Sequence, residues 1–342
     1  MTSHITSAEV AKIALEMRSR FLVPFPLEPC MSGVSNWSQR LPASLKQPID
    51  AFCDAIIATH ATTTLPYQLA SSGASAIHFQ RFHMAERIRS LKVGPWESRT
   101  EDEKKVSEKN AYEVACNKFH SYQSSSAGLN ALVEDLSSAL LTALNNSATA
   151  EAADELLYQA VVSLWSAFEV FARDELTIVL NGWPSLTERL LSDPSTKKLF
   201  ELPKISIDDL SSVDFDLSKS MGNVLFGSRD FSDIRTIKAA FGSICDDPEL
   251  ARELNSDLLW HLNQDRHLIV HRRGIVDRRY LSVTKRNVEL GDRINVTPDE
   301  VETYFKATTN AATAILQGLS KVLSDSEINP DVEVPSDLHG NR

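Results

Sequence analysis

The sequence predicts an all-α protein, and two features of the 342-residue chain carry this prediction. Apolar residues recur mostly at helical spacing, while the strict alternation of apolar and polar residues that marks half-buried strands is nearly absent. Helix-start signals accompany this pattern, most clearly TPDE at 297–300, with Thr as N-cap, Pro at the first helical position and Glu at the third. At 42% hydrophobic residues, the composition is that of a globular protein with a sizeable core.

The first 125 residues are expected to form a mostly helical region of unknown role. An amphipathic helix opens the chain, and proline then interrupts the stretches FLVPFPLEP and LPASLKQP. Helical patterns follow over residues 51–57, 77–91 and 101–122. The small, polar segment SYQSSSAG is typical of a junction, so we place a domain boundary after residue 125.

A second helical domain is expected over residues 126–323. It begins with the helix GLNALVEDLSSALLTALNN, and a longer helix covers residues 151–180 before Asn-Gly and Pro stop it. After an irregular acidic stretch at 202–220, the patterns predict helices over residues 231–244 and 248–270.

The end of this domain is expected to contain its one β element. Gly274 is a natural C-cap after the helix that precedes it. The segments YLSVT and RINV flank NVELGD, which predicts a small β-hairpin. The closing helix then runs from the cap at Thr297 to about Leu323. Residues 324–342 are polar and contain proline, as is typical of a disordered tail.

Composition narrows the class of protein. No apolar run approaches the ~20 residues of a membrane span, and the N-terminus lacks a signal-peptide layout. Four scattered cysteines without a CxxC pair favour a reducing compartment, so we expect a cytoplasmic protein. The chain has a net charge of −11, yet residues 260–286 carry seven Lys or Arg against two Asp, a local +5 that leaves −16 for the remainder. This segment is either a focused anion site or a solvated basic helix face.

Chemistry in the basic segment DRHLIVHRRGIVD centres on Arg266 and His271. Imidazole titrates near neutrality and can act as general base or acid, and a guanidinium offers donors that suit phosphate oxygens. Five residues place the two side chains about 140° apart on a helix, so they do not share a face. Arg266 continues an apolar stripe and needs an acidic partner; Glu169 lies in a similar stripe and is the candidate, unless it faces water.

These groups suit attack of an RNA 2′-hydroxyl on the adjacent phosphodiester, which needs no metal. His271 would move the proton and Arg266 would stabilise charge on the phosphorane. The residues expected to bind the flanking RNA are His267, Arg272, Arg273, Arg278 and Arg279. A metal site on His267 and His271, which have i,i+4 spacing, is disfavoured because the Glu of a zincin helix and a third ligand are lacking. No cofactor motif is present, and none is expected.

RHLIVH also resembles the R-x4-6-H motif of the HEPN superfamily. The run RHLIVHRRGIVDRRYL, followed by GDRINV and a closing helix, is similar to the C-terminal half of bacterial HEPN proteins of the RiboL-PSP kind. The upstream helix SLWSAFEVFARDEL resembles the helix that precedes the motif in such proteins. The resemblance covers roughly residues 128–323 and leaves the first 125 residues unassigned.

The resemblance implies a HEPN-like helical bundle that forms a homodimer with both motifs in one cleft. It implies a metal-independent endoribonuclease acting as a toxin or anti-phage effector, with RNA as substrate and an antitoxin or defence-system protein as partner. Glu169 matches the polar position that the family carries on an earlier helix. Two alternatives stay open: an inactive module for dimerisation, nucleotide binding or partner binding, and a protein whose main function lies in residues 1–125.

Overall fold

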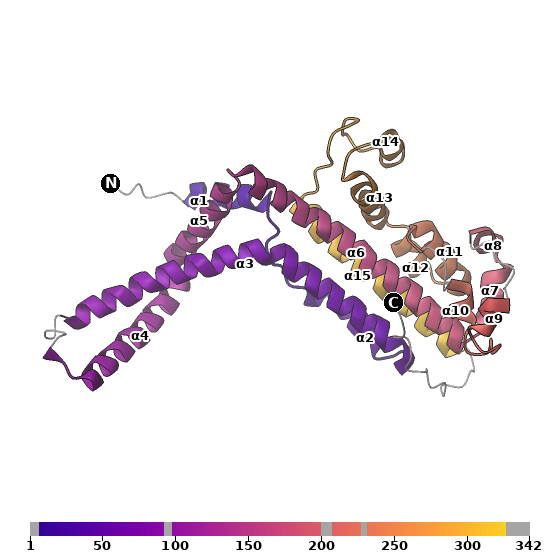
Figure 1. Cartoon of the computed structure of the whole chain (residues 1–342), viewed down its shortest axis with the longest axis horizontal. Coiled ribbons are helices and arrows are strands. Elements are labelled where there is room, and N and C mark those ends of the chain that lie inside the picture. Colours follow the sequence, from indigo (N-terminus) through magenta and orange to yellow (C-terminus); the bar gives the residue numbers. More distant parts are fainter. Residues whose placement is uncertain (1–6, 92–97, 200–206, 227–230, 326–342) are drawn as a thin grey trace. The chain divides into compact units, whose positions relative to one another are not determined.

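The computed structural model describes residues 7–91, 98–199, 207–226 and 231–325 (Figure 1). Helices dominate these segments, and no strand occurs within them. Their β pairing is limited to an isolated antiparallel bridge between Ile275 and Arg293. The predicted all-α class is therefore confirmed.

The chain divides into two compact units that do not follow the boundary predicted after residue 125. Unit 1 combines Met1–Pro24 with Thr62–Leu156, and unit 2 combines Phe25–Ala61 with Leu157–Arg342. The long helices α3 (Lys46–Leu91) and α6 (Ser147–Gly182) contribute residues to both units. The segment SYQSSSAG forms a tight turn inside unit 1, where Ser125 caps the next helix by accepting a hydrogen bond from the Gly128 N–H. Small polar residues here serve a helix cap, and the sequence pattern of a cap resembles that of a linker.

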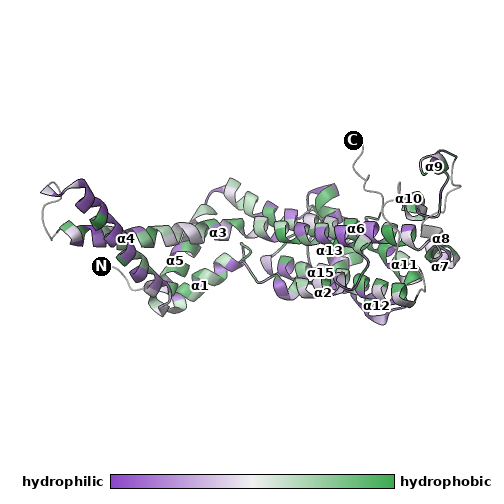
Figure 2. Ribbon diagram, turned by 90° about the horizontal axis from the view of Figure 1, so that it is seen from below, coloured by the Kyte–Doolittle hydropathy of each residue, from purple (hydrophilic) through white to green (hydrophobic). Residues whose placement is uncertain are grey.

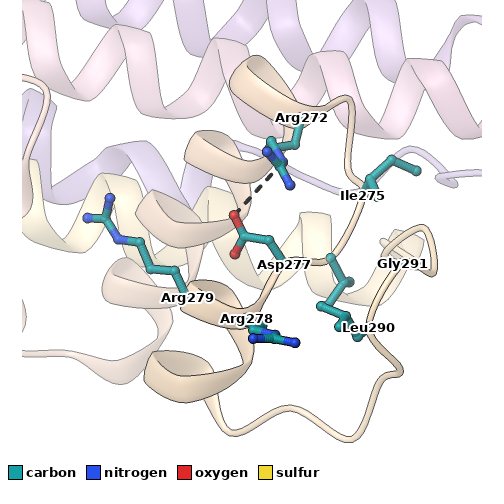
Figure 3. A pocket seen from close by; sticks show the side chains of 8 residues that line it. Arg272, Ile275, Asp277, Arg278, Arg279, Leu290 and Gly291 are labelled. Atoms are coloured by element: carbon teal, nitrogen blue, oxygen red, sulfur yellow. Dashed lines mark ion pairs between the residues drawn. The ribbon is translucent and has the colours of Figure 1, made fainter.

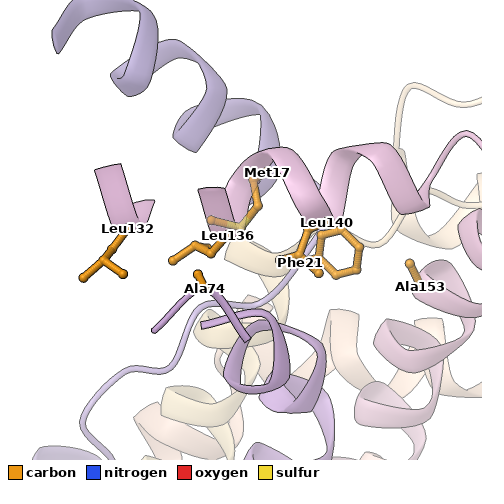
Figure 4. Packing of buried hydrophobic residues seen from close by; sticks show 7 residues of the cluster. All are labelled: Met17, Phe21, Ala74, Leu132, Leu136, Leu140 and Ala153. Carbon is orange, nitrogen blue, oxygen red and sulfur yellow. The ribbon is translucent and has the colours of Figure 1, made fainter. Parts of the chain in front are cut away.

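Unit 1 is built from α1 (Ser7–Arg18), α4 (Glu101–Gln123), α5 (Ser126–Ala143) and parts of α3 and α6. α1 and α4 both pack against α5. Hydrophilic residues cover most of α4, which leaves it a small buried face (Figure 2). The hydrophobic cluster of this unit is drawn in Figure 4 and comprises Met17, Phe21, Ala74, Leu132, Leu136, Leu140 and Ala153.

Unit 2 contains the basic segment and the larger core. Its last helix, α15 (Pro298–Asp325), packs against α2 (Glu28–Ser38), α12 (Pro248–Leu254) and α13 (Asp257–Arg272). The predicted capping box at its start is confirmed: the Thr297 hydroxyl accepts from the Glu300 N–H, and the Glu300 carboxylate accepts from the Thr297 N–H. The side chains that line the core are almost fully buried on both long helices and include Leu164, Trp165, Phe168 and Phe171 of α6 and Phe305, Ala311 and Ile315 of α15.

Short helices fill the stretch between α6 and α12. They are α7 (Leu186–Ser192), α8 (Pro194–Leu199), α9 (Ile207–Ser211), α10 (Met221–Phe226) and α11 (Ile234–Ile244). The acidic stretch at 202–220 is expected to be irregular. Its residues 202–206 lie outside the described ones, and the rest consists of α9 followed by turns. The tail predicted from residue 324 likewise lies almost wholly outside them.

Three predictions of helix extent differ from the structure. The helical patterns expected over residues 51–57 and 77–91 are parts of one continuous helix, α3. The helix expected over residues 248–270 is broken into α12 and α13, because Ser256 has an extended backbone (ψ 131°). The helix expected from residue 231 begins at Ile234, where the Asp233 side chain accepts from the Arg235 N–H and caps α11.

The predicted β-hairpin is wrong. YLSVT is helical and lies within α14 (Arg278–Thr284), which starts where Asp277 accepts a hydrogen bond from the Tyr280 N–H. The segment RINV does make antiparallel contacts, but with residues 274–276: the Ile294 N–H donates to the Gly274 carbonyl. A local cap and a buried tyrosine therefore outweigh the β-propensity of this segment.

Candidate functional site

The cationic residues of the stretch 260–286 lie on α13 (Asp257–Arg272), in the turn after it, and on and just after α14 (Arg278–Thr284). α13 stops where Arg273 and Gly274 take left-handed backbone angles, with φ of 53° and 78°. A Cβ at position 274 would lie 2.8 Å from the Tyr158 hydroxyl oxygen, so both the angle and the close approach call for glycine. The predicted role of Gly274 as a helix stop is confirmed.

A buried polar network holds this segment in place. Asp265 is fully buried, and its carboxylate accepts hydrogen bonds from the hydroxyls of Tyr280 (2.6 Å) and Tyr304 (2.7 Å) and from Arg286 (3.0 Å). Burial raises the pKa of Asp265, and the Arg286 guanidinium acts against that rise. Glu300 is the second anion beside Arg286, at 3.4 Å. The network joins α13, α14 and α15, so it sets where the neighbouring residues of α13 stand.

Arg266 lies beside Glu169, as its position in an apolar stripe predicts. The guanidinium Nη2 is 3.8 Å from a Glu169 carboxylate oxygen, and both side chains are less than a fifth exposed. The predicted contact between α13 and α6 is thus confirmed as an ion pair, but it is longer than a hydrogen bond. The Arg266 Nε is buried and has no hydrogen-bond partner within the described part of the chain. Because this N–H is buried, an anion would reach it only after neighbouring side chains shift, and would then satisfy it.

The two histidines of the segment lie against one another. The ring centroids of His267 and His271 are 4.5 Å apart, as their spacing along one helix face predicts. Partial burial, followed by the positive charges of His271, Arg279 and Arg266, lowers the pKa of His267. The neutral form of the His267 imidazole is therefore favoured, first by burial and then by the surrounding positive charges.

The first of two cavities beside these residues lies between the end of α13, the turn after it and the loop before α15 (Figure 3). It has a volume of about 460 Å³. Figure 3 shows Arg272 facing Asp277 across it, at 3.9 Å, while Arg278 and Arg279 point away from one another. Among the described residues that line this cavity, Asp277 is the one carboxylate and the arginines number three.

The second cavity, of about 380 Å³, lies between the N-terminus of α11 and the helices α13 and α14. Its lining includes Arg279 of α14 and four residues of α13, namely Trp260, Asn263, Gln264 and His267. Because Arg279 lines both cavities, the two openings are adjacent.

The structure brings some of the predicted site residues together and keeps others apart. Four of the five predicted RNA contacts line a cavity, namely His267, Arg272, Arg278 and Arg279, and the fifth, Arg273, is exposed at the helix end. Arg266 and His271 share no hydrogen bond or ion pair among the described residues. One copy of the chain therefore does not assemble the predicted catalytic pair, consistent with their separation of about 140° around α13.

Sequence reasoning missed the residues that anchor and complete this region. Asp265 lies three residues after Leu262 and four before Ile269, so it is on the apolar stripe as fully as Arg266 is. That spacing was a usable signal for a buried carboxylate, whereas the hydroxyl donors from α14 and α15 lie 15 and 39 residues away in the sequence. No pattern pointed to Trp260 and Gln264, because the α11 wall of their cavity comes from a distant segment.

Comparison with known proteins adds no assignment. No protein-family model, curated protein or solved structure matches this chain. Across the described segments, no cluster of three or more His, Cys, Asp or Glu is placed to hold a metal ion. No helix in those segments combines the length and apolarity needed to cross a membrane.

Proposed function

We propose that this chain is a metal-independent endoribonuclease of the HEPN type that cleaves RNA by attack of a 2′-hydroxyl. The observation that supports it most is the state of Arg266: a largely buried guanidinium held by Glu169 at 3.8 Å, with an Nε–H that has no partner in the described chain. Such a group suits a phosphate oxygen, because charge-assisted hydrogen bonds would satisfy it. The cationic cavities alongside supply further contacts for the RNA backbone.

The reaction divides between the two motif groups, His271 and Arg266. His271 takes the proton from the 2′-hydroxyl, whose oxygen attacks the adjacent phosphorus. Arg266 stabilises the negative charge that develops on the phosphorane oxygens, and Glu169 keeps that guanidinium oriented. The bond from phosphorus to the 5′-oxygen breaks, and the proton that His271 removed passes to that oxygen, which restores the neutral imidazole. The products are a 2′,3′-cyclic phosphate and a 5′-hydroxyl.

Two copies of the chain form the site in this proposal. Arg266 and His271 project from different faces of α13, so a two-fold axis beside the helix would place His271 of one copy near Arg266 of the other. A toxin or anti-phage role, with an antitoxin or defence protein as partner and action in the cytoplasm, is the biological setting we propose.

The test is cleavage of several RNAs, including tRNA and rRNA, by the purified full chain in EDTA. Wild type should yield 2′,3′-cyclic phosphate ends, and Arg266→Ala or His271→Ala should remove activity. His120→Ala, at an exposed histidine of α4, is the matched control and should cleave as wild type does. If wild type and the Arg266 and His271 variants are equally inert, or equally active, on every RNA, the proposal is abandoned.

Mixing the two inactive variants tests the shared site. An Arg266→Ala copy paired with a His271→Ala copy contains one intact Arg and one intact His on different subunits, so exchange should restore part of the activity. No recovery, in a sample whose sedimentation shows mixed dimers, would place both groups within one subunit. A purely monomeric protein that still cleaves RNA would contradict the dimer.

A binding or dimerisation module without catalysis is the second candidate, favoured by the absence of an Arg266–His271 contact within one copy. It predicts that His271→Ala leaves the cellular effect of expression unchanged. Growth arrest that either Arg266→Ala or His271→Ala relieves would instead favour the nuclease. Expression of residues 126–342 alone would not separate the two candidates cleanly, because the cut falls inside unit 1.

A further inference from the structure

The second cavity has a composition that phosphate binding alone does not explain. Beside the His267 imidazole and the Arg279 guanidinium it presents the indole of Trp260 and the side-chain amide of Gln264. Its volume of about 380 Å³ falls in the range of ~300–1,000 Å³ typical of sites for small organic groups. A flat aromatic face, an amide and a guanidinium are the groups that proteins use for an unpaired base and its phosphate.

We propose that this cavity binds one unpaired base of the RNA, with the base stacked on Trp260, its edge at Gln264 and its phosphate at Arg279. The proposal rests on the ribonuclease function above and names the part of the substrate that the cavity recognises. It assigns Trp260 and Gln264 to base selection, and it leaves proton transfer to the residues already described.

The aromatic wall is held in position. Trp260 is half-buried on α13, and its ring meets the ring of His261 edge-on, with centroids 4.9 Å apart. One indole face can therefore stay open to the cavity without the side chain having to be ordered on binding, which lowers the entropic cost of stacking.

The amide is oriented by a short chain of hydrogen bonds. Asn263 is buried and donates from its amide nitrogen to the Ser232 carbonyl at 3.0 Å, and its oxygen accepts from Gln264 Nε2 at 3.3 Å. This leaves the Gln264 carbonyl oxygen as an acceptor with no partner in the described chain. A base that offers an amino or imino N–H at its edge would satisfy it, so the cavity has the means to prefer some bases over others.

Charge in the cavity suits a nucleotide rather than a bare cation. Asp233 is its one carboxylate, and that group already caps α11 and pairs with Arg235, whose Nε lies 2.9 Å away. The Arg279 guanidinium remains to face an anion, and the His267 imidazole lies in the same cavity as a further hydrogen-bonding group. Because Arg279 also lines the first cavity, a strand whose base enters the second cavity would lead its backbone towards Arg272 and Arg278.

Binding of RNA that cannot be cleaved tests the proposal apart from catalysis. Fluorescein-labelled hexanucleotides of A, C, G or U, fully 2′-O-methylated, would be titrated with the full chain and followed by anisotropy. Trp260→Ala should weaken the best-bound hexanucleotide at least about five-fold, the lower end of what base stacking contributes, and Trp260→Phe should restore most of it. The matched control is Trp37→Ala, a half-buried tryptophan of unit 2 that does not line the cavity.

Two further variants separate base recognition from charge. Gln264→Ala should change the order of affinity among the four hexanucleotides, whereas Arg279→Ala should weaken all four alike. The inference is overturned if folded Trp260→Ala binds all four as wild type does, or if wild type binds none. It is also overturned as an RNA site if 5′-mononucleotides bind as tightly as the hexanucleotides. Should Trp260→Ala fail to fold, Trp260→Leu against Trp260→Phe makes the same comparison.

Parallel cleavage assays keep the two proposals distinguishable. If wild type cleaves RNA but Trp260→Ala binds the hexanucleotides as wild type does, the ribonuclease proposal stands and the base-binding proposal is refuted. If hexanucleotide binding depends on Trp260 but no RNA is cleaved, the base-binding proposal stands and the ribonuclease proposal is refuted.

Discussion

Glu175→Gln is expected to stabilise the protein, and by more at alkaline than at acidic pH. Glu175 lies on α6 with no exposed surface, and neither of its carboxyl oxygens has a hydrogen-bond partner in the described chain. Burial, followed by the nearby Asp174 charge, raises the pKa of Glu175 from 4.5 to about 9. The folded protein therefore keeps this carboxyl protonated at neutral pH.

The size of the effect follows from the difference between the folded and unfolded pKa. In the unfolded chain the carboxyl ionises above pH 4.5, whereas the folded chain holds the proton until about pH 9. The folded state thus binds more protons in this window, so its stability falls as pH rises, by about 1.4 kcal/mol per pH unit. At pH 7 the stability lost through the raised pKa of Glu175 amounts to about 3 kcal/mol. A glutamine at this position does not titrate, so the variant does not lose this stability.

Urea unfolding followed by tryptophan fluorescence measures the effect, since the buried Trp165 and Trp183 report on unit 2. The stability difference between Glu175→Gln and wild type should grow from below about 1 kcal/mol at pH 5 to about 5 kcal/mol at pH 8. Glu188→Gln, at an exposed carboxylate of α7, is the control and should show no such growth. An equal difference at both pH values would refute the reasoning.

Three other substitutions have defined outcomes. Tyr280→Phe removes a buried hydroxyl that donates to Asp265, so urea unfolding should show a loss of about 1.5–3 kcal/mol; an unchanged midpoint would contradict the anchoring network. Gly274→Ala should destabilise the protein by at least about 1 kcal/mol, because φ is 78° there, while Gly242→Ala, with open space around it, should be neutral or stabilising; equal effects would refute the argument. Arg279→Ala should reduce the slope of log affinity for RNA against log salt by about one, and an unchanged slope would mean that this residue meets no phosphate.

Local sequence signals predicted local structure well in several places. The cap at Thr297 and the stop at Gly274 both depend on neighbouring residues alone, and both occur as expected. The Arg266–Glu169 pair was also predictable, because a charged residue inside an apolar stripe needs a partner in a similar stripe. The roles of these residues in catalysis stay predictions.

Amino-acid composition predicted the backbone conformation less well where two local preferences compete within one segment. YLSVT has the composition of a strand, yet Asp277 caps it as a helix and Tyr280 points into the core, where its hydroxyl meets Asp265. The segment SYQSSSAG has the composition of a linker and forms a helix cap instead. In both segments one side chain selects among backbone conformations of similar energy. The sequence pattern alone does not show which conformation is the most stable.

By itself, the sequence determined the all-α class, most of the long helices and the concentration of cationic side chains in one segment, because periodicity, caps and charge are local properties of the chain. Only the tertiary structure decided that Asp265 anchors that segment, that Arg266 keeps an unsatisfied N–H beside Glu169, and that Trp260 and Gln264 share a cavity with Arg279. Each of these depends on which distant helices pack together, and packing is selected by the free energy of the whole core.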